Sequence, residues 1–156
     1  MSKVPLDTEV ICHNRKAAFR FEILERFECG IVLCGTEVKS LRGKNVSLDE
    51  AYARLDDDEV WLIGTHIGGY SFATSQKHEA LRRRKLLLHA REIRKLRPKV
   101  EQKGLTLVPL RMYFNERGIA KVTVALARGK TLGDKRRTIQ TREHKREMDR
   151  ATRRKA

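Results

Sequence analysis

A regular alternation of apolar and polar residues runs from position 19 to position 33. Seven of the odd positions are apolar, beginning with Phe19 and ending with Leu33, whereas the even positions include Arg20, Glu22 and Glu28. A repeat of two is that of a β-strand with one buried and one solvated face. A strand this long usually bends around a small barrel, and Gly30 is the expected site of the bend.

Further strands are predicted downstream. Residues 51–55 and 59–63 are predicted to form a hairpin. The three consecutive aspartates between them indicate a solvated turn rather than a metal site. Residues 66–72 predict a short strand. Residues 105–114 and 119–127 predict a final hairpin, with a bulge or an edge position where the apolar parity switches beside Pro109. In its second strand Val122, Val124 and Leu126 face inward and Lys121 faces outward.

Two helices are predicted between these strands. Residues 36–41 read as a short helix with Thr36 as its N-cap, followed by a basic turn over 42–45. Residues 85–96 read as an amphipathic helix that ends near Pro98, and Leu87 lies about a quarter-turn off its apolar stripe. A basic cluster, residues 82–85, opens this helix. Positive charge at a helix N-terminus is unfavourable, so the cluster predicts a phosphate partner.

The last 29 residues, from Arg128 onward, hold 12 Lys and Arg against 4 Asp and Glu. Their few large apolar residues cannot form a core, yet no Pro occurs and no Gly follows Gly133. We expect this tail to be disordered alone and helical once a polyanion neutralises it. The alternative is a solvated tail that serves solubility alone.

The net charge of +15 and the pI of about 10.2 favour a nucleic-acid partner over an anionic membrane surface. No apolar run approaches the ~20 residues that a membrane span needs, and no signal segment opens the chain. The three cysteines are expected to be buried, reduced thiols of a cytoplasmic protein.

Motifs of catalysis are not found in the sequence: it lacks a phosphate-binding Gly loop, an HExxH pair and a nucleophile elbow, and its five histidines lack ligand spacing. The chain is therefore expected to be a binding module without metal or cofactor. The predicted class is mainly β (α+β), an oligonucleotide-binding-type antiparallel barrel with flanking helices. The barrel domain is assigned to residues 1–130 and the tail to residues 131–156.

The chain resembles the SmpB family of SsrA-binding proteins. The matching stretches are NRKA at 14–17, FECGIVLCGTEVKSLRGKNVSL at 27–48, RKLLLHAREI at 84–93, KGLTLVPLRMYF at 103–114, KVTVALARGK at 121–130 and DKR at 134–136. They occur in order across nearly the whole chain, so the resemblance is highly specific.

The resemblance implies a non-enzymatic RNA-binding adaptor of trans-translation. Such a protein binds the tRNA-like domain of transfer-messenger RNA and delivers it to a stalled ribosome, where the tail probes the empty mRNA channel. It implies a cytoplasmic monomer, linked to elongation factor Tu and alanyl-tRNA synthetase only through the RNA. The alternatives are another ribosome- or tRNA-associated barrel protein, of the initiation-factor kind, and an RNA-modifying enzyme.

The family's RNA-contact positions fall on Glu28, Leu87 and Lys121, which the periodicities place off the core faces. The other RNA-binding candidates are Asn14, Glu37, Lys39, Arg42, Lys44, Arg84, Lys85, Arg128 and Lys130. The resemblance assigns Asp134, Lys135 and Arg136 to the decoding centre of the ribosome. Gly133 stands where many relatives have an aromatic residue, and Ala151 and Thr152 stand where relatives can carry bulky apolar residues.

Overall fold

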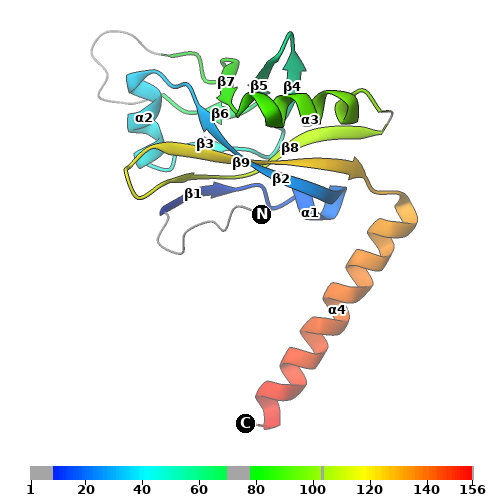
Figure 1. The fold of residues 1–156 in the computed structure, drawn as a ribbon. Helices are drawn as coiled ribbons and strands as arrows, with labels where there is room; N and C mark the ends of the chain where they lie inside the picture. Colours follow the sequence, from blue (N-terminus) through cyan, green and yellow to red (C-terminus); the bar gives the residue numbers. More distant parts are fainter. Residues whose placement is uncertain (1–8, 70–77, 103, 156) are drawn as a thin grey trace.

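The computed structural model describes residues 9–69, 78–102 and 104–155 (Figure 1). In chain order its elements are β1 (Glu9–His13), α1 (Ala17–Arg20), β2 (Phe21–Ile31), α2 (Gly35–Arg42), β3 (Val46–Ser47), β4 (Tyr52–Asp56), β5 (Glu59–Ile63), β6 (His66–Ile67), β7 (Arg84–Leu87), α3 (Ala90–Val100), β8 (Leu105–Phe114), β9 (Ala120–Gly129) and α4 (Leu132–Lys155). Of the strand predicted over 66–72, positions 70–72 lie outside the described residues.

A closed antiparallel barrel forms the body. In the described residues, seven strands follow the order β1-β8-β4-β5-β7-β2-β9, and β9 pairs again with β8. The second pairing joins β8, β4, β5, β7, β2 and β9 into a ring, with β1 added along β8. The predicted oligonucleotide-binding-type barrel with flanking helices is confirmed.

The alternation that begins at Phe19 is confirmed as β2, although its first residues belong to α1. Phe27 and Cys29 are 6% and 0% exposed, and they face the barrel interior with Val122 and Val124 of β9. Burying such side chains is the main favourable term in forming the barrel. The core therefore occupies the face of β2 that the sequence pattern indicates.

Both predicted hairpins are confirmed. The β4–β5 turn holds Asp57 at φ 42° and Asp58 at φ 65°, the paired positive values of a tight two-residue hairpin turn. In the β8–β9 turn the Asn115 side chain accepts hydrogen bonds from the backbone N–H groups of residues 117 and 119. A register shift between Pro109 and Arg111 confirms the bulge just beyond the predicted parity switch.

The predicted helix over 85–96 is wrong at both ends. Arg84–Leu87 is strand β7, because β5 and β2 offer it pairing partners on its two sides. The helix α3 begins at Ala90, after a capping box in which the Glu92 carboxylate accepts the backbone N–H of His89 at 3.0 Å. It continues past Pro98, which does not end it.

The short helix α2 (Gly35–Arg42) has its N-cap two residues earlier than predicted. Its N-cap is Cys34 rather than Thr36, and the Glu37 carboxylate accepts the Cys34 backbone N–H at 2.9 Å.

All three cysteines are free thiols. Cys29 is buried and Cys12 half-buried, but Cys34 is exposed, so the expectation of three buried thiols is wrong for Cys34.

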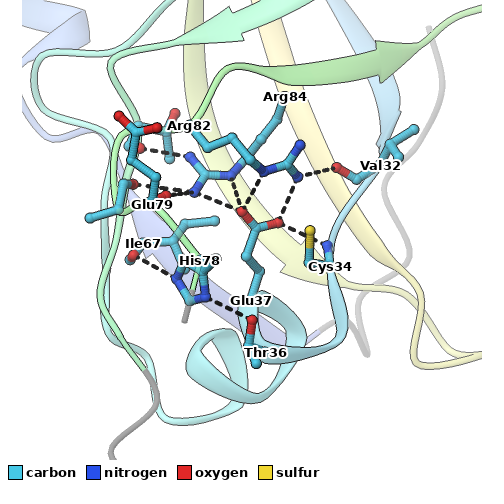
Figure 2. A network of polar contacts seen from close by, with 11 residues as sticks. Val32, Cys34, Thr36, Glu37, Ile67, His78, Glu79, Arg82 and Arg84 are labelled. Carbon is cyan, nitrogen blue, oxygen red and sulfur yellow. Dashed lines mark hydrogen bonds and ion pairs between the residues drawn. The ribbon is translucent and has the colours of Figure 1, made fainter. Parts of the chain in front are cut away.

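Glu37 is the centre of a buried ionic network that ties α2 to β7 (Figure 2). Arg82 donates to both carboxylate oxygens, at 3.0 and 2.9 Å, and Arg84 donates through Nε at 3.0 Å. The Arg84 guanidinium also donates to the carbonyl of Thr65 at 2.8 Å. The side chains of Glu37 and Arg84 are 0% exposed, so each supplies the counter-charge that the other needs in the interior.

The same network sets the protonation of its members. Burial alone raises the pKa of Glu37, but hydrogen bonds from Arg82, the Cys34 backbone N–H and Arg84 outweigh it and bring the pKa to about 2. Beside it, His78 contacts the Thr36 hydroxyl through Nδ1 at 2.9 Å and the carbonyl of Ile67 through Nε2 at 3.0 Å. Because a carbonyl only accepts, His78 carries its proton on Nε2.

The basic cluster of residues 82–85 therefore does not open a helix, and the phosphate predicted for it is replaced by protein carboxylates. Arg83 lies 3.6 Å from Asp56 and stacks over the Trp61 ring at 4.3 Å. Lys85 pairs with Glu59 at 2.7 Å.

The tail forms the continuous helix α4, which extends away from the barrel (Figure 1). The helical capacity predicted for the tail is confirmed, and its disorder in the free protein stays a prediction. Two hydrogen bonds between Thr131 and Asp134 cap the start of the helix. The Asp134 carboxylate accepts a bond from the Thr131 hydroxyl at 2.7 Å, and the Thr131 hydroxyl accepts one from the Asp134 N–H at 3.3 Å.

None of the described helices is long and apolar enough to cross a membrane.

We predict that Glu37→Ala destabilises the fold strongly, because it leaves the buried charge of Arg84 uncompensated. Breaking one side of such a pair costs about 3–5 kcal/mol, measured as the free energy of unfolding in urea. The matched control is Glu59→Ala, whose partner Lys85 is 38% exposed, and it should cost at most about 1 kcal/mol. Equal losses in the two variants would contradict this prediction.

The effect has a defined pH dependence. The pKa of Glu37 falls from its ordinary 4.5 to about 2 on folding, so the carboxylate stabilises the native state fully above pH ~4.5. The contribution is lost as pH falls towards 2. The difference in unfolding free energy between wild type and Glu37→Ala should therefore shrink across that interval.

Candidate RNA interface

Strand pairing brings Leu87, Gly30 and Lys121 into one row across β7, β2 and β9. Gly30 pairs with Leu87 on one side and with Lys121 on the other. Glu28 lies two residues before Gly30 and pairs with Thr123. Because residues that pair across strands share a face, and residues two apart do as well, these side chains lie on one outer surface. We call Glu28, Gly30, Leu87 and Lys121 the outer row.

Leu87 is the apolar member of the outer row and is 52% exposed. Its outward direction was predicted from a helical stripe, but it follows from the alternation of β7, in which Arg84 and Leu86 are buried. Glu28 and Lys121 are half-buried, with their immediate neighbours Cys29 and Val122 inside the barrel. The outward orientation predicted for all three residues is confirmed.

Gly30 allows Leu87 to lie close over the sheet. A Cβ added at Gly30 would lie 3.2 Å from Cβ of Leu87 and 3.4 Å from one of its methyl carbons. A larger residue at position 30 would push Leu87 off this position, since so short a carbon contact forces the neighbour to move. The glycine therefore fixes how the exposed leucine sits between the flanking strands.

Strand β8 extends the outer row with residues that the sequence analysis did not single out. Tyr113 pairs with Lys121, and Arg111 pairs with Thr123. The Arg111 guanidinium stacks over the Tyr113 ring at 4.8 Å and reaches the Thr123 hydroxyl at 3.5 Å. Their parity after the Pro109 bulge, matched to that of Lys121, is the sequence signal that could have identified them.

The hydroxyl of Tyr113 is buried beside the carboxylate of Glu28. Burial raises the pKa of this phenol to about 12, and the neighbouring Glu28 carboxylate raises it further. The group therefore stays a neutral donor at any physiological pH. A proton donor thus stands beside the carboxylate of the outer row.

Three predicted contact residues, Asn14, Glu37 and Arg84, are buried, so the structure does not place their side chains on the outer surface with the outer row. Glu37 and Arg84 form an ion pair with each other inside the buried network. Asn14 is 8% exposed, and its side-chain amide donates to the carbonyl of Pro109 at 2.9 Å. These residues hold together the elements that carry the surface.

The remaining basic candidates lie outside the outer row. Lys85 is paired with Glu59, Arg128 lies 4.0 Å from Glu22, and Lys130 donates to the carbonyl of Ala18 at 2.9 Å. Exposed positions on α2 and the turn that follows it are occupied by Lys39, Arg42 and Lys44.

The three residues assigned to the decoding centre are the third to the fifth residues of α4. The Asp134 carboxylate is engaged with Thr131, whose hydrogen bonds lower its pKa. Arg136 is exposed and Lys135 is half-buried. Asp134 therefore starts the helix, while the two cations that follow it project from the helix.

Among the described residues, no group of three or more His, Cys, Asp or Glu side chains could hold a metal ion. The surface instead combines an exposed leucine, a carboxylate, a lysine and an arginine, and the arginine stacks on the buried ring of Tyr113. Such a mixture suits the bases, riboses and phosphates of a folded RNA, which offer stacking faces, hydroxyls and negative charge.

Comparisons with known proteins agree along the chain. Residues 11–154 match the family model described as SmpB protein. The SsrA-binding protein of Thermosynechococcus vestitus is 54% identical over 92% of this chain and 94% of its own length. The SsrA-binding protein of Nostoc sp. is 55% identical over 92% of both chains.

A solved structure supports the same assignment. It is described as "tmRNA-SmpB: a journey to the center of the bacterial ribosome", and its matching chain is 52% identical, with a TM-score of 0.66 over 78% of this chain and 85% of that one. The match of the family model over 144 residues and the similarity to these relatives show that the chain belongs to the SmpB family.

Proposed function

We propose that this protein is an RNA-binding adaptor of trans-translation. It binds the tRNA-like domain of transfer-messenger RNA and delivers that RNA to ribosomes stalled on a message without a usable stop codon. The names of its relatives, SsrA-binding proteins, and the ribosomal setting of the similar solved structure support this function. The adaptor acts in the cytoplasm as a monomer and without catalysis, and reaches elongation factor Tu and alanyl-tRNA synthetase only through the RNA.

The outer row is the observation that carries the proposal. An exposed leucine 52% accessible to solvent can pack against unstacked bases or riboses of an RNA loop. Lys121 pairs with a phosphate. Glu28 repels phosphate, so it accepts hydrogen bonds from base edges or 2′-hydroxyls, which gives this surface selectivity for a folded RNA.

The tail supplies the second half of the function. The 24 residues of α4 span ~36 Å at ~1.5 Å per residue, and the tail from Arg128 carries 12 Lys and Arg. A message channel walled by ribosomal RNA phosphate is open to such a helix only when downstream message is missing. Entry releases counterions and is therefore favourable. In this proposal Lys135 and Arg136, near the start of the helix, lie nearest the decoding centre.

Leu87→Ala and Lys121→Ala should each weaken binding to the tRNA-like domain without lowering the thermal stability of the barrel, because both side chains face outward. Loss of the Lys121 phosphate contact should reduce the log–log salt slope of affinity by about one, whereas Leu87→Ala should leave that slope unchanged. Gel shifts at several salt concentrations measure both quantities.

The control RNA is a length-matched transcript without the tRNA-like fold. Wild type that binds it as tightly as the tRNA-like domain would favour a less selective ribosome-associated barrel protein. Turnover of the RNA in the presence of added metals would favour an RNA-modifying enzyme. Variants that bind like wild type would show that the RNA face lies elsewhere.

A chain that ends after Arg128 keeps every strand of the barrel except the last residue of β9. It should fold and bind the tRNA-like domain, yet fail to start tagging on a stalled ribosome. The double variant Lys135→Ala/Arg136→Ala should behave in the same way, because it removes only these two cations near the start of the helix. Tagging of a nascent chain in a reconstituted translation system is the measurement.

The matched control is Arg153→Ala/Arg154→Ala, which removes the same charge from the far end of the helix. It should reduce tagging less than the change at positions 135 and 136. Tagging at the full rate by the truncated chain would exclude the proposed role of the tail.

A further inference from the structure

The helix α3 presents three basic side chains on its outer face. Leu96 is 1% exposed, and Ile93 and Val100 pack with it against the barrel core. At about 100° per residue, Arg91, Arg94 and Lys95 lie on the opposite side of the helix, and all three are exposed. We call these three residues the α3 basic face.

The α3 basic face differs from the other cations of its helix in having no carboxylate partner. Arg97 pairs with Asp58, and Lys99 donates to Glu25 at 2.6 Å. Neither a hydrogen bond nor an ion pair joins the side chain of Arg91, Arg94 or Lys95 to any described residue. Three positive charges are thus left to solvent in one cluster.

This cluster is unfavourable for the helix itself. Arg91 occupies the first turn, where the helix dipole disfavours positive charge. Arg94 and Lys95 stand three and four residues further on, and like charges at these spacings repel one another. Glu92, the acidic residue of that turn, is engaged in the capping box with His89. A polyanion outside the protein would remove both penalties.

Only a short stretch of chain separates the outer row from the α3 basic face. Leu87 closes β7, and Arg91 follows four residues later as the second residue of α3, which is at most ~14 Å of extended chain (Figure 1). An RNA in contact with Leu87 therefore extends its backbone over α3 within a few nucleotides. Long cationic side chains on adjacent helical turns can reach neighbouring phosphates.

We propose that Arg91, Arg94 and Lys95 form a second contact surface for transfer-messenger RNA, which binds the backbone phosphates adjoining the segment held by the outer row. The inference rests on the proposed function. It assigns positioning rather than sequence recognition to α3, because phosphate contacts set register and orientation and base edges carry sequence.

The test compares Arg91→Gln/Arg94→Gln with Arg97→Gln/Lys99→Gln in the full-length protein. Both variants remove two positive charges from α3, but the second removes cations already paired with carboxylates. Binding to the isolated tRNA-like domain is measured from low to high salt. The first variant should lose about tenfold or more in affinity near 0.1 M salt, with a log–log slope smaller by about two, and the second should keep a slope within about one of wild type.

Thermal unfolding should show the first variant to be at least as stable as wild type, since the substitutions relieve repulsion. The single variant Arg94→Gln, expected to lower the slope by about one, provides the same test with the smallest change. Equal slopes for wild type and the first variant would overturn the inference. So would a defect seen only with ribosomes, because these cations would then serve ribosomal RNA.

The result separates this inference from the proposed function. If wild type binds the tRNA-like domain selectively and Leu87→Ala weakens it, the proposed function holds whatever α3 does. If wild type shows no selectivity for that RNA, the proposed function fails and the inference fails with it.

Discussion

The pairing of β2 with both β7 and β9 is the constraint on which the rest of the structure depends. Because paired residues share a face, this register puts Cys29 and Val122 inside the barrel and Gly30, Leu87 and Lys121 outside. A slip of one residue would exchange the two sets, expose the core and bury the outer row. The buried apolar face therefore fixes the geometry of the polar one. The composition of the outer surface can be set by RNA binding, while its register is maintained by the core.

Positive charge has two distinct uses in this molecule. Arg82, Arg84 and Lys85 are paired with carboxylates, and the buried guanidinium of Arg84 has its counter-charge in Glu37. Elsewhere, on α3 and α4, cations stand on exposed helical faces. The net +15 of the chain is consequently a poor guide to any single position, because the same residue type serves as an internal tie in one place and as a free charge in another. Only the location of the carboxylates distinguishes the two uses.

Predictions from sequence periodicity and turn residues were correct where the structure of an element depends mainly on its own residues. The alternation before Leu33 indicated the strand and its buried face, and the two hairpins followed from their turns. Such predictions failed at positions 84–87, because the run Leu86, Leu87 and Leu88 fits a helical stripe as well as a strand. In the tail, Thr131 and Asp134 have the spacing of a capping box, which is a local signal for the start of a helix and agrees with the helical capacity predicted there.

The sequence by itself determined the barrel class, the positions of the long strands along the chain, the basic character of the tail, the family resemblance and the outward direction of Glu28 and Lys121. Periodicity and charge are properties of neighbouring residues, and they can be read without knowledge of the fold. Only the tertiary structure decided that Leu87 lies on a strand beside Gly30, that Arg84 is internal, and that Arg111 joins the same surface, stacked on the buried ring of Tyr113. Each of these depends on which strands pair, and strand pairing is settled by contacts between residues far apart in the chain.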